Sequence, residues 1–329
     1  MVMVLAIPVG AQTDYRNPCP ALQALTAFDL DNPHIEPNQV ALVHDLAQQA
    51  EQYLAHERPS IALQRRVQLL AHFTDVSAGK SLTWVDLAQS KDPAVVFLRD
   101  TLRWPAPPGL VFIRSYDSLD DMPSFVRSGF QRSNTQGVTL GCRYIALKRR
   151  WDRVNQSLPS PFDKRILSHE LTHAYINSTL GPRRHQLPLW FHEAMAAYAS
   201  GTGNLEHDID VSLGPGGIET TSYEDPVDYQ TYALVFRYLR HHWGRKPFHH
   251  CLRECLLQAS VEPLFKQAQV RNYQFLVIDA RYWQNRQQRL RFWIALGVLL
   301  VVMTWCWWHL PRHGAEEEKP TSEPSEEVR

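Results

Sequence analysis

Apolar residues recur at intervals of three and four positions through the first third of the chain, the spacing that places them on one face of an α-helix. Three such stretches are QVALVHDLAQQAEQYLAHE, IALQRRVQLLAHF and SLTWVDLAQS, and polar segments containing Pro or Gly separate them. The pattern therefore predicts a helical N-terminal region over residues 12–105.

The pattern changes after residue 105. The segments GLVFIRSY (residues 109–116) and GVTLGCRYIALKRR (residues 137–150) alternate apolar and polar positions, as strands with one buried face do. Helical spacing returns from residue 161, so residues 106–288 are expected to combine a small mixed sheet with several helices, which is an α+β fold. The segment Gly201–Asp225 has no periodicity and is expected to form a loop that covers a cleft.

One of the predicted helices carries a metal-ligand pattern. The segment LSHELTHAYI contains an HExxH motif on a helix that begins near Pro161. One helical turn separates His169 from His173, so both imidazoles project from one face and can reach one metal ion, whereas Glu170 is displaced by about 100°. Two imidazoles suit Zn²⁺, and the adjacent carboxylate suits a general base that takes a proton from water.

The next predicted helix offers a third ligand. It begins at Pro188 in LPLWFHEAMAAYASG, and Glu193 lies level with His173 if the two helices pack antiparallel. His192 is the competing ligand, because neighbours on a helix point about 100° apart and only one of the two can face the metal.

The HELTH motif followed by LWFHEAMAAY resembles the gluzincins, zinc metallopeptidases with a glutamate as third ligand, and especially the peptidase MA-like families related to aminopeptidase N. The stretches YQTYALVFRYLRHHWG and VEPLFKQAQVRNYQFLVIDARYW are similar to the helices that follow the site in this family, so the resemblance covers residues 109–283. It departs from the family pattern at His192, Ala194 and Ala197. None of these three is a ligand or the base in that pattern.

The resemblance implies a zincin-like catalytic domain with one Zn²⁺ per chain, held by His169, His173 and Glu193. It assigns the general base to Glu170 and assistance at the oxyanion to Tyr229; Tyr232, about one turn further along, is the alternative. The implied activity is hydrolysis of peptide bonds in a peptide or protein substrate. The alternative function is a catalytically inactive zincin-like module that binds a partner through its cleft or its helical region.

A strand upstream of the motif bears on the kind of peptidase. Aminopeptidases of the resembling group bind the α-ammonium group of the substrate with an acidic residue in a G-x-M-E-N strand, whereas the counterpart TLGCRYIAL contains Arg143 and no acid. If Arg143 points into the cleft, it repels an α-ammonium group, which favours an endopeptidase. If Arg143 points away, as strand alternation equally permits, it has no such effect.

The segment FWIALGVLLVVMTWCWWHL, Phe292–Leu310, contains no Lys, Arg, Asp or Glu. It is as long as the about 20 residues that cross a bilayer core, and tryptophans near both ends suit the two interfaces. We therefore predict one transmembrane helix over residues 289–310, in contact with membrane lipid, and an acidic disordered tail over residues 311–329.

Two features disagree about the orientation of this span. The arginines at positions 281, 286, 289 and 291 precede it, which places the catalytic domain in the cytoplasm. The segment VMVLAIPVGAQ resembles the apolar core and cleavage site of a signal peptide, so residues 1–11 are interpreted as a signal-peptide remnant. An extracytoplasmic catalytic domain is the favoured expectation, and the cytoplasmic face is the alternative.

Charge and cysteine content add two points. The chain has 34 Lys and Arg against 34 Asp and Glu, so its charge does not favour a nucleic acid as partner. The cysteines outside the span permit two disulfides, with free buried thiols as the alternative. They are Cys19, Cys142, Cys251 and Cys255.

Overall fold

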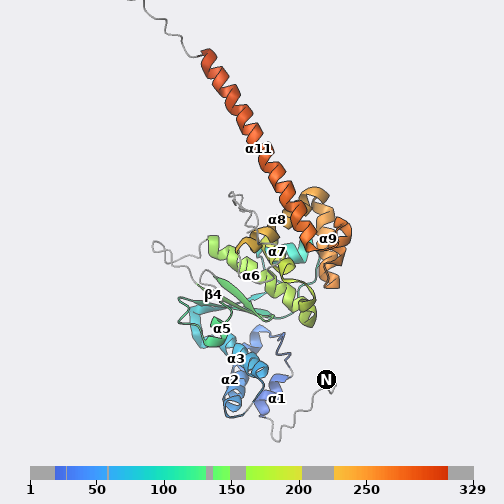
Figure 1. The fold of residues 1–329 in the computed structure, drawn as a ribbon. Helices are drawn as coiled ribbons and strands as arrows, with labels where there is room; N and C mark the ends of the chain where they lie inside the picture. Colours follow the sequence, from blue (N-terminus) through green and yellow to red (C-terminus); the bar gives the residue numbers. More distant parts are fainter. Residues whose placement is uncertain are drawn as a thin grey trace, which may run out of the picture. The chain divides into compact units, whose positions relative to one another are not determined.

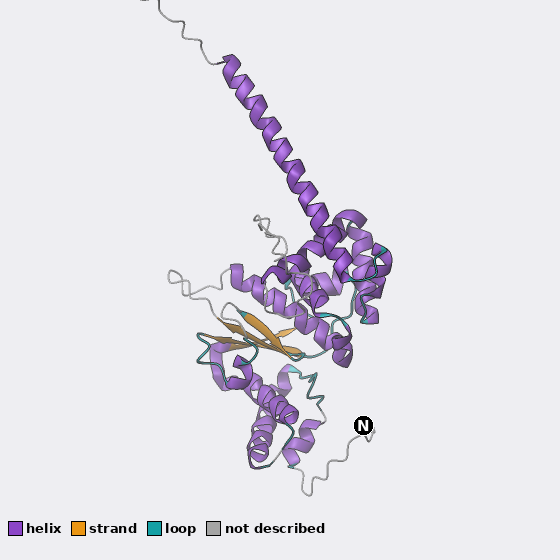
Figure 2. Cartoon of the chain, in the orientation of Figure 1, coloured by secondary structure: helices purple, strands orange, loops and turns teal. Residues whose placement is uncertain are grey.

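The structure is a computed structural model in which most of the chain is described. The described residues are 19–26, 28–57, 59–130, 136–148, 161–201 and 226–309. The backbone alone is described for residues 80, 161–163, 226–230 and 309. The described part is mostly helical with a small mixed sheet, so the expected α+β class is confirmed (Figures 1 and 2).

The chain divides into two compact units. Unit 1 ends at Ala280 and unit 2 begins at Arg281. The domain boundaries that the sequence analysis placed after residues 105 and 288 stay predictions.

The N-terminal part of unit 1 forms the helices α1 (Pro20–Thr26), α2 (Val40–His56) and α3 (Ile61–Thr74). Helix α3 begins after Ser60, whose hydroxyl accepts a hydrogen bond from the backbone N–H of Leu63 at 3.2 Å. Such a cap satisfies one of the backbone donors that a helix leaves without an internal partner. The helices predicted over the first two periodic stretches are therefore confirmed.

The sheet has four strands in the order β1-β2-β4-β3. The strands are β1 (Leu82–Asp86), β2 (Leu110–Tyr116), β3 (Gly137–Leu140) and β4 (Tyr144–Lys148). Strand β2 pairs antiparallel with β1 and parallel with β4, whereas β3 pairs antiparallel with β4, with Thr139 opposite Ile145. The strands predicted within 109–116 and 137–150 are therefore confirmed, and β3 lies at one edge of the sheet.

Strand β1 corrects the sequence analysis, which predicted a helix for SLTWVDLAQS. Residues Leu82–Asp86 pair along β2, from Leu82 opposite Arg114 to Asp86 opposite Leu110. Thr, Trp and Val at the centre of this segment favour a strand. In so short a window the helical and strand spacings of apolar residues are not distinguishable, and the available pairing with β2 decides the outcome.

Helices cover both faces of the sheet in unit 1 (Figure 2). On one face the N-terminal helices and the strands share a hydrophobic core in which Phe73 of α3 packs against Tyr144 of β4, their ring centroids 5.2 Å apart. Helix α6 (Pro161–Leu180) packs beside β3 and β4 on the other face. Shorter elements complete this part of unit 1: η1 (Pro37–Gln39), η2 (Val76–Ser81), α4 (Pro93–Val96), η3 (Phe97–Thr101) and α5 (Ser124–Arg127).

Helix α6 and the helices that follow it form the rest of unit 1. Those that follow are η4 (Gly181–Gln186), α7 (Leu189–Ala199), α8 (Pro226–Trp243), α9 (Arg245–Gln258) and α10 (Glu262–Ala268). Gly181, with φ +54°, follows the last residue of α6. Pro188 directly precedes α7, in agreement with the predicted start of this helix. Trp190 of α7 stacks on Tyr273 with a centroid distance of 4.4 Å, which anchors α7 in the helical core.

Helix α11 (Tyr273–His309) begins in unit 1, where Leu276, Val277 and Ala280 are buried, and continues through the described part of unit 2. In unit 2 most of its apolar side chains are exposed, among them Trp293 at 64% and Val301 at 69%. The helix is long and apolar enough to cross a membrane, with a mean hydropathy of 1.8 over the most apolar window. The predicted helix is therefore present; its orientation stays a prediction, as does the nature of residues 311–329, which lie outside the described part.

Candidate metal centre

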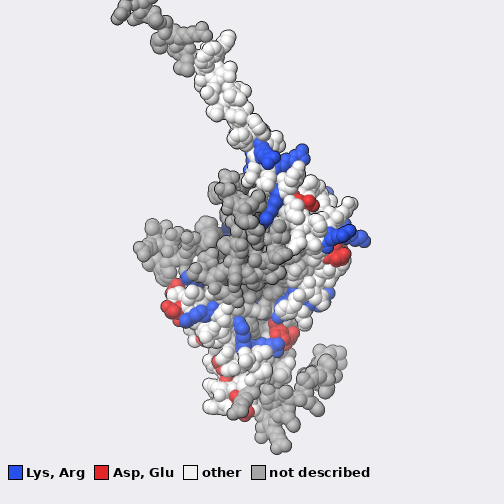
Figure 3. Space-filling model, in the orientation of Figure 1, with Lys and Arg blue, Asp and Glu red and all other residues white. Residues whose placement is uncertain are grey.

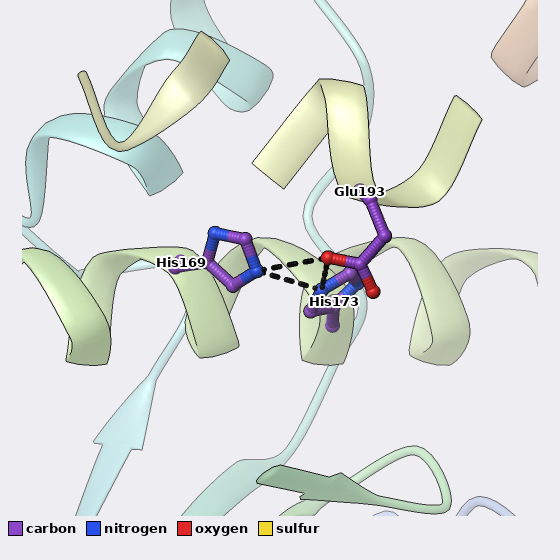
Figure 4. Close-up of side chains that lie close together, drawn as sticks. All are labelled: His169, His173 and Glu193. Atoms are coloured by element: carbon purple, nitrogen blue, oxygen red, sulfur yellow. Dashed lines mark hydrogen bonds and ion pairs between the residues drawn. The ribbon is translucent and has the colours of Figure 1, made fainter. Parts of the chain in front are cut away.

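Helices α6 and α7 bring His169, His173 and Glu193 together at one point (Figure 4). The Nε2 atom of His169 lies 3.2 Å from Oε2 of Glu193 and 3.1 Å from Nε2 of His173. The Nε2 atom of His173 lies 3.5 Å from Oε2 of Glu193. The candidate ligand atoms of the three residues all lie within 4.8 Å of one another. The group can therefore hold a metal ion.

Glu193 is the most deeply buried member of the group, with 4% of its surface exposed. Burial by itself would raise the pKa of Glu193, but the two neighbouring histidines hold it far below its usual range. Burial would likewise lower the pKa of His173, but the carboxylate of Glu193 raises it above its usual value. The buried carboxylate of Glu193 is therefore ionised. Its negative charge stabilises a cation at this point, which can be a metal ion.

His192, the competing ligand, lies outside the group. Its Nε2 atom is 3.1 Å from the backbone carbonyl of Arg184, and its ring centroid is 6.3 Å from that of His173. Burial, followed by the charge of His173, lowers the pKa of His192 to about 4. The structure thus turns Glu193 toward the two histidines and uses the neutral His192 to connect α7 with the preceding turn.

Glu170 is buried, 7% exposed, and strand β3 fixes its carboxylate. The hydroxyl of Thr139 lies 2.7 Å from Oε2 of Glu170 and 3.0 Å from its backbone carbonyl, and it can donate to either oxygen. Gly137 leaves room for the carboxylate, because a Cβ atom there would lie 2.9 Å from Cγ of Glu170 and 2.8 Å from a methyl carbon of Ile166. Residues 137 and 139 share one face of the strand, so the side chain of Glu170 packs against both.

The motifs of the sequence did not single out Thr139 or Gly137 as residues of the site. The available signal was the alternation within GVTL, which puts both residues on one side of a strand. That signal does not say which helix the strand will contact. A second contact that the sequence pattern does not indicate is the hydrogen bond from Ser168 Oγ to Asp92 Oδ2, 2.6 Å long. It connects α6, next to His169, with the N-terminal capping residue of α4.

Arg143 points away from this site, which is the second of the two orientations that strand alternation permitted. Its side chain is fully buried, its Nε donates to Oδ1 of Asn32 at 2.8 Å, and one terminal nitrogen donates to the carbonyl of Gly109 at 3.2 Å. Burial lowers the pKa of Arg143 to about 10, so it stays protonated at neutral pH. The expected repulsion of an α-ammonium group by Arg143 therefore has no basis in the structure.

The side chain of Tyr229 lies outside the described residues, although its backbone belongs to α8. The alternative, Tyr232, is 8% exposed and its ring centroid lies 6.1 Å from that of Tyr273, so it packs within the helical core. The loop expected over the cleft is described only at Gly201, and residues 202–225 lie outside the described part.

The cysteines of the described part are free thiols rather than disulfides. Cys142, Cys251 and Cys255 are buried, and Cys19 is partly buried. Of the two alternatives, the structure therefore shows free thiols.

No family model, no curated protein and no solved structure matches the chain. The site is therefore interpreted from its own geometry and chemistry.

Proposed function

We propose that this protein is a membrane-anchored zinc metallopeptidase that hydrolyses peptide bonds. The convergence of His169, His173 and Glu193 beside the buried Glu170 carries the proposal. Three protein ligands leave one position of a four-coordinate metal open to water or substrate, whereas a structural zinc site is closed by four. Among the described residues, the group contains three candidate ligands.

The spacing of the ligand atoms supports zinc. Bonds of about 2.0–2.1 Å in a tetrahedral site separate neighbouring ligand atoms by about 3.3 Å. The two Nε2 atoms lie 3.1 Å apart, and they lie 3.2 and 3.5 Å from Oε2 of Glu193. Two imidazoles and one carboxylate are also a ligand set found in catalytic zinc sites.

When bound, zinc supplies a Lewis acid that polarises the substrate carbonyl and makes water more acidic. Glu170 is the proposed base: it takes the proton from the attacking water and passes it to the nitrogen of the leaving amine. Thr139 donates to Oε2 of Glu170, which leaves Oε1 to exchange the proton. Tyr229 is the proposed donor to the oxyanion, on the basis of the family resemblance.

The position of the sheet beside the site supports a zincin-like fold and an extended substrate. Strand β3 is an edge strand, and α6, which carries the HExxH motif, packs beside it. An edge strand offers backbone donors and acceptors to an added peptide strand. We therefore propose that a peptide substrate pairs with β3.

An endopeptidase preference rests on the absence of an acid rather than on the charge of Arg143. Strand β3 has the sequence GVTL, so it provides no carboxylate to bind an α-ammonium group. Charge recognition of a free amino terminus needs such a partner in a partly desolvated cleft. Internal bonds are therefore the proposed targets.

The first experiment measures metal content and turnover on the same preparation. Full-length protein purified in a neutral detergent is assayed for zinc and for cleavage of a peptide pool, with and without a chelator. About one zinc per chain and chelator-sensitive cleavage are expected, and His173→Ala should lose both. Zinc binding without cleavage of any peptide would support the inactive binding module instead, and absence of zinc would contradict the proposed metallopeptidase.

A further inference from the structure

Helix α11 carries a group of arginines directly before its apolar stretch. Arg286, Arg289 and Arg291 are exposed, and the charge-free segment begins at the next residue, Phe292. Figure 3 shows the apolar stretch as a continuous white surface, with blue side chains where it begins. In the sequence no Asp or Glu occurs between Asp279 and Glu316, so this part of the helix has no acidic residue of its own to neutralise the arginines.

The height of this group along the helix matches a headgroup layer. A rise of about 1.5 Å per residue separates Arg286 from Arg291 by about 7.5 Å. The polar layer on each side of a bilayer core is about 5–7.5 Å thick, given a total of about 40–45 Å and a core of about 30 Å. If the core begins at Phe292, the three guanidinium groups lie at the level of the lipid phosphates.

The distribution around the helix fits a surrounding layer better than a single partner. At about 100° per residue, Arg289 lies about 60° to one side of Arg286 and Arg291 about 140° to the other. A protein partner docking on one face would contact only part of this set. Lipid headgroups surround a spanning helix and can reach all three.

We propose that Arg286, Arg289 and Arg291 form an arginine collar that binds the phosphate groups of anionic phospholipids. The inference rests on the membrane anchor proposed above, but it is independent of catalysis. A guanidinium group binds phosphate through paired hydrogen bonds, and each cation near an anionic surface adds to the attraction. Zwitterionic lipids offer the same phosphate together with a covalently attached cation, so they are bound less well.

The test compares two spin-labelled lipids in vesicles that contain the full-length protein. Vesicles of phosphatidylcholine receive either spin-labelled phosphatidylglycerol or spin-labelled phosphatidylcholine, and the fraction of each lipid immobilised by the protein gives their relative association constants. A preference for phosphatidylglycerol of at least about threefold is expected, and it should weaken at high salt. Free inorganic phosphate at a matched ionic strength should not remove it, because the proposed ligand is a lipid headgroup.

Variants with matched charge changes identify the residues responsible. Replacing Arg286, Arg289 and Arg291 together by Gln should bring the preference close to one, whereas replacing all three by Lys should keep most of it. A control variant changes three exposed cations of unit 1 to Gln and should behave as the parent. Its substitutions are Lys91→Gln, Arg103→Gln and Lys266→Gln.

Two outcomes separate this inference from the membrane anchor. If the protein does not float with vesicles and resist alkaline extraction, the anchor itself is wrong and the collar is wrong with it. If the protein is inserted but the parent shows no preference, or the Gln variant keeps the full preference, the collar alone is overturned. Neither outcome bears on zinc binding or peptide cleavage, which are measured separately.

Discussion

The Nε2 atom of His169 lies 3.2 Å from Oε2 of Glu193, although 24 residues separate them along the chain. His169 extends from α6 and Glu193 from α7, so this contact depends on the packing of the two helices against each other (Figure 4). A carboxylate buried between two imidazoles is costly unless positive charge compensates it. A metal ion bound at this point would supply that charge, and this relationship makes Glu193 the candidate ligand from α7.

Glu193→Ala is expected to weaken zinc binding by about 100-fold or more, because it removes a ligand atom from the centre. The matched change at the neighbouring position, His192→Ala, should weaken binding by less than about tenfold, since His192 contacts the carbonyl of Arg184 instead. A zinc titration of both variants in competition with a chromogenic chelator measures the ranking. The reverse ranking would transfer the ligand role to His192.

Glu170→Gln should retain about one zinc per chain and lose hydrolysis by a factor of about 10² to 10⁴, because an amide keeps the shape of the side chain but accepts no proton. Metal analysis and turnover of an internally cleaved, amino-blocked peptide are measured on one preparation. Turnover equal to that of the parent would exclude Glu170 as the base.

Thr139→Val should lower kcat by about tenfold or more and leave KM nearly unchanged, because it removes the hydroxyl that orients Glu170 without opening a cavity. Thr139→Ser retains the hydroxyl and should recover most of the loss. Zinc content serves as the control for folding of the site and should stay at the parental value in both variants. Equal losses in the Ser and Val variants would indicate a packing role for the Thr139 methyl group instead.

Arg143→Met should lower the free energy of unfolding by about 2–4 kcal/mol, because the buried oxygen of Asn32 and the partly buried carbonyl of Gly109 lose their donor. Turnover per folded molecule should be unchanged, since Arg143 does not face the site. Lys91→Met, at an exposed position, is the control and should shift stability by no more than about 0.5 kcal/mol. Urea unfolding in neutral detergent gives the stabilities. A large change in peptide preference with unchanged stability would indicate that Arg143 faces the cleft.

The stability of unit 1 should fall as the pH drops from 7 to 5, in part through His72. Its Nε2 atom is 2.6 Å from the hydroxyl of Tyr116, and Nδ1 is 3.2 Å from a terminal nitrogen of Arg114. Burial, followed by the charge of Arg114, lowers the pKa of His72 to about 4. The folded pKa therefore lies below the unfolded value of about 6.5, so the contribution is complete above pH 6.5 and is lost as the pH falls toward 4.

Partial solvent exposure of His72 limits this contribution to about 1–2 kcal/mol between pH 7 and pH 5. The variant His72→Gln should lose less stability over the same interval than the parent, because it has no proton to take up at this position. Urea unfolding at the two pH values measures the difference. An identical pH dependence in parent and variant would show that His72 does not contribute.

Several features could be predicted because they depend on local spacing along the chain. One helical turn between His169 and His173 places both rings on one face of α6 whatever surrounds the helix. The uninterrupted apolar segment from Phe292 likewise predicts the exposed part of α11 from composition and length alone. Pro188 similarly marked the start of α7 through its fixed φ angle.

Other features depended on which elements meet, and local spacing does not contain that information. The sequence allowed either His192 or Glu193 as the candidate ligand. The rotation of α7, to which the packing of Trp190 contributes, places Glu193 and not His192 beside the two histidines. Pairing with β2 made Leu82–Asp86 a strand. The periodicity of a strand or helix predicts which residues share one of its faces. It does not predict which distant residues pack against that face, as the hydrogen bond between Thr139 of β3 and Glu170 of α6 shows.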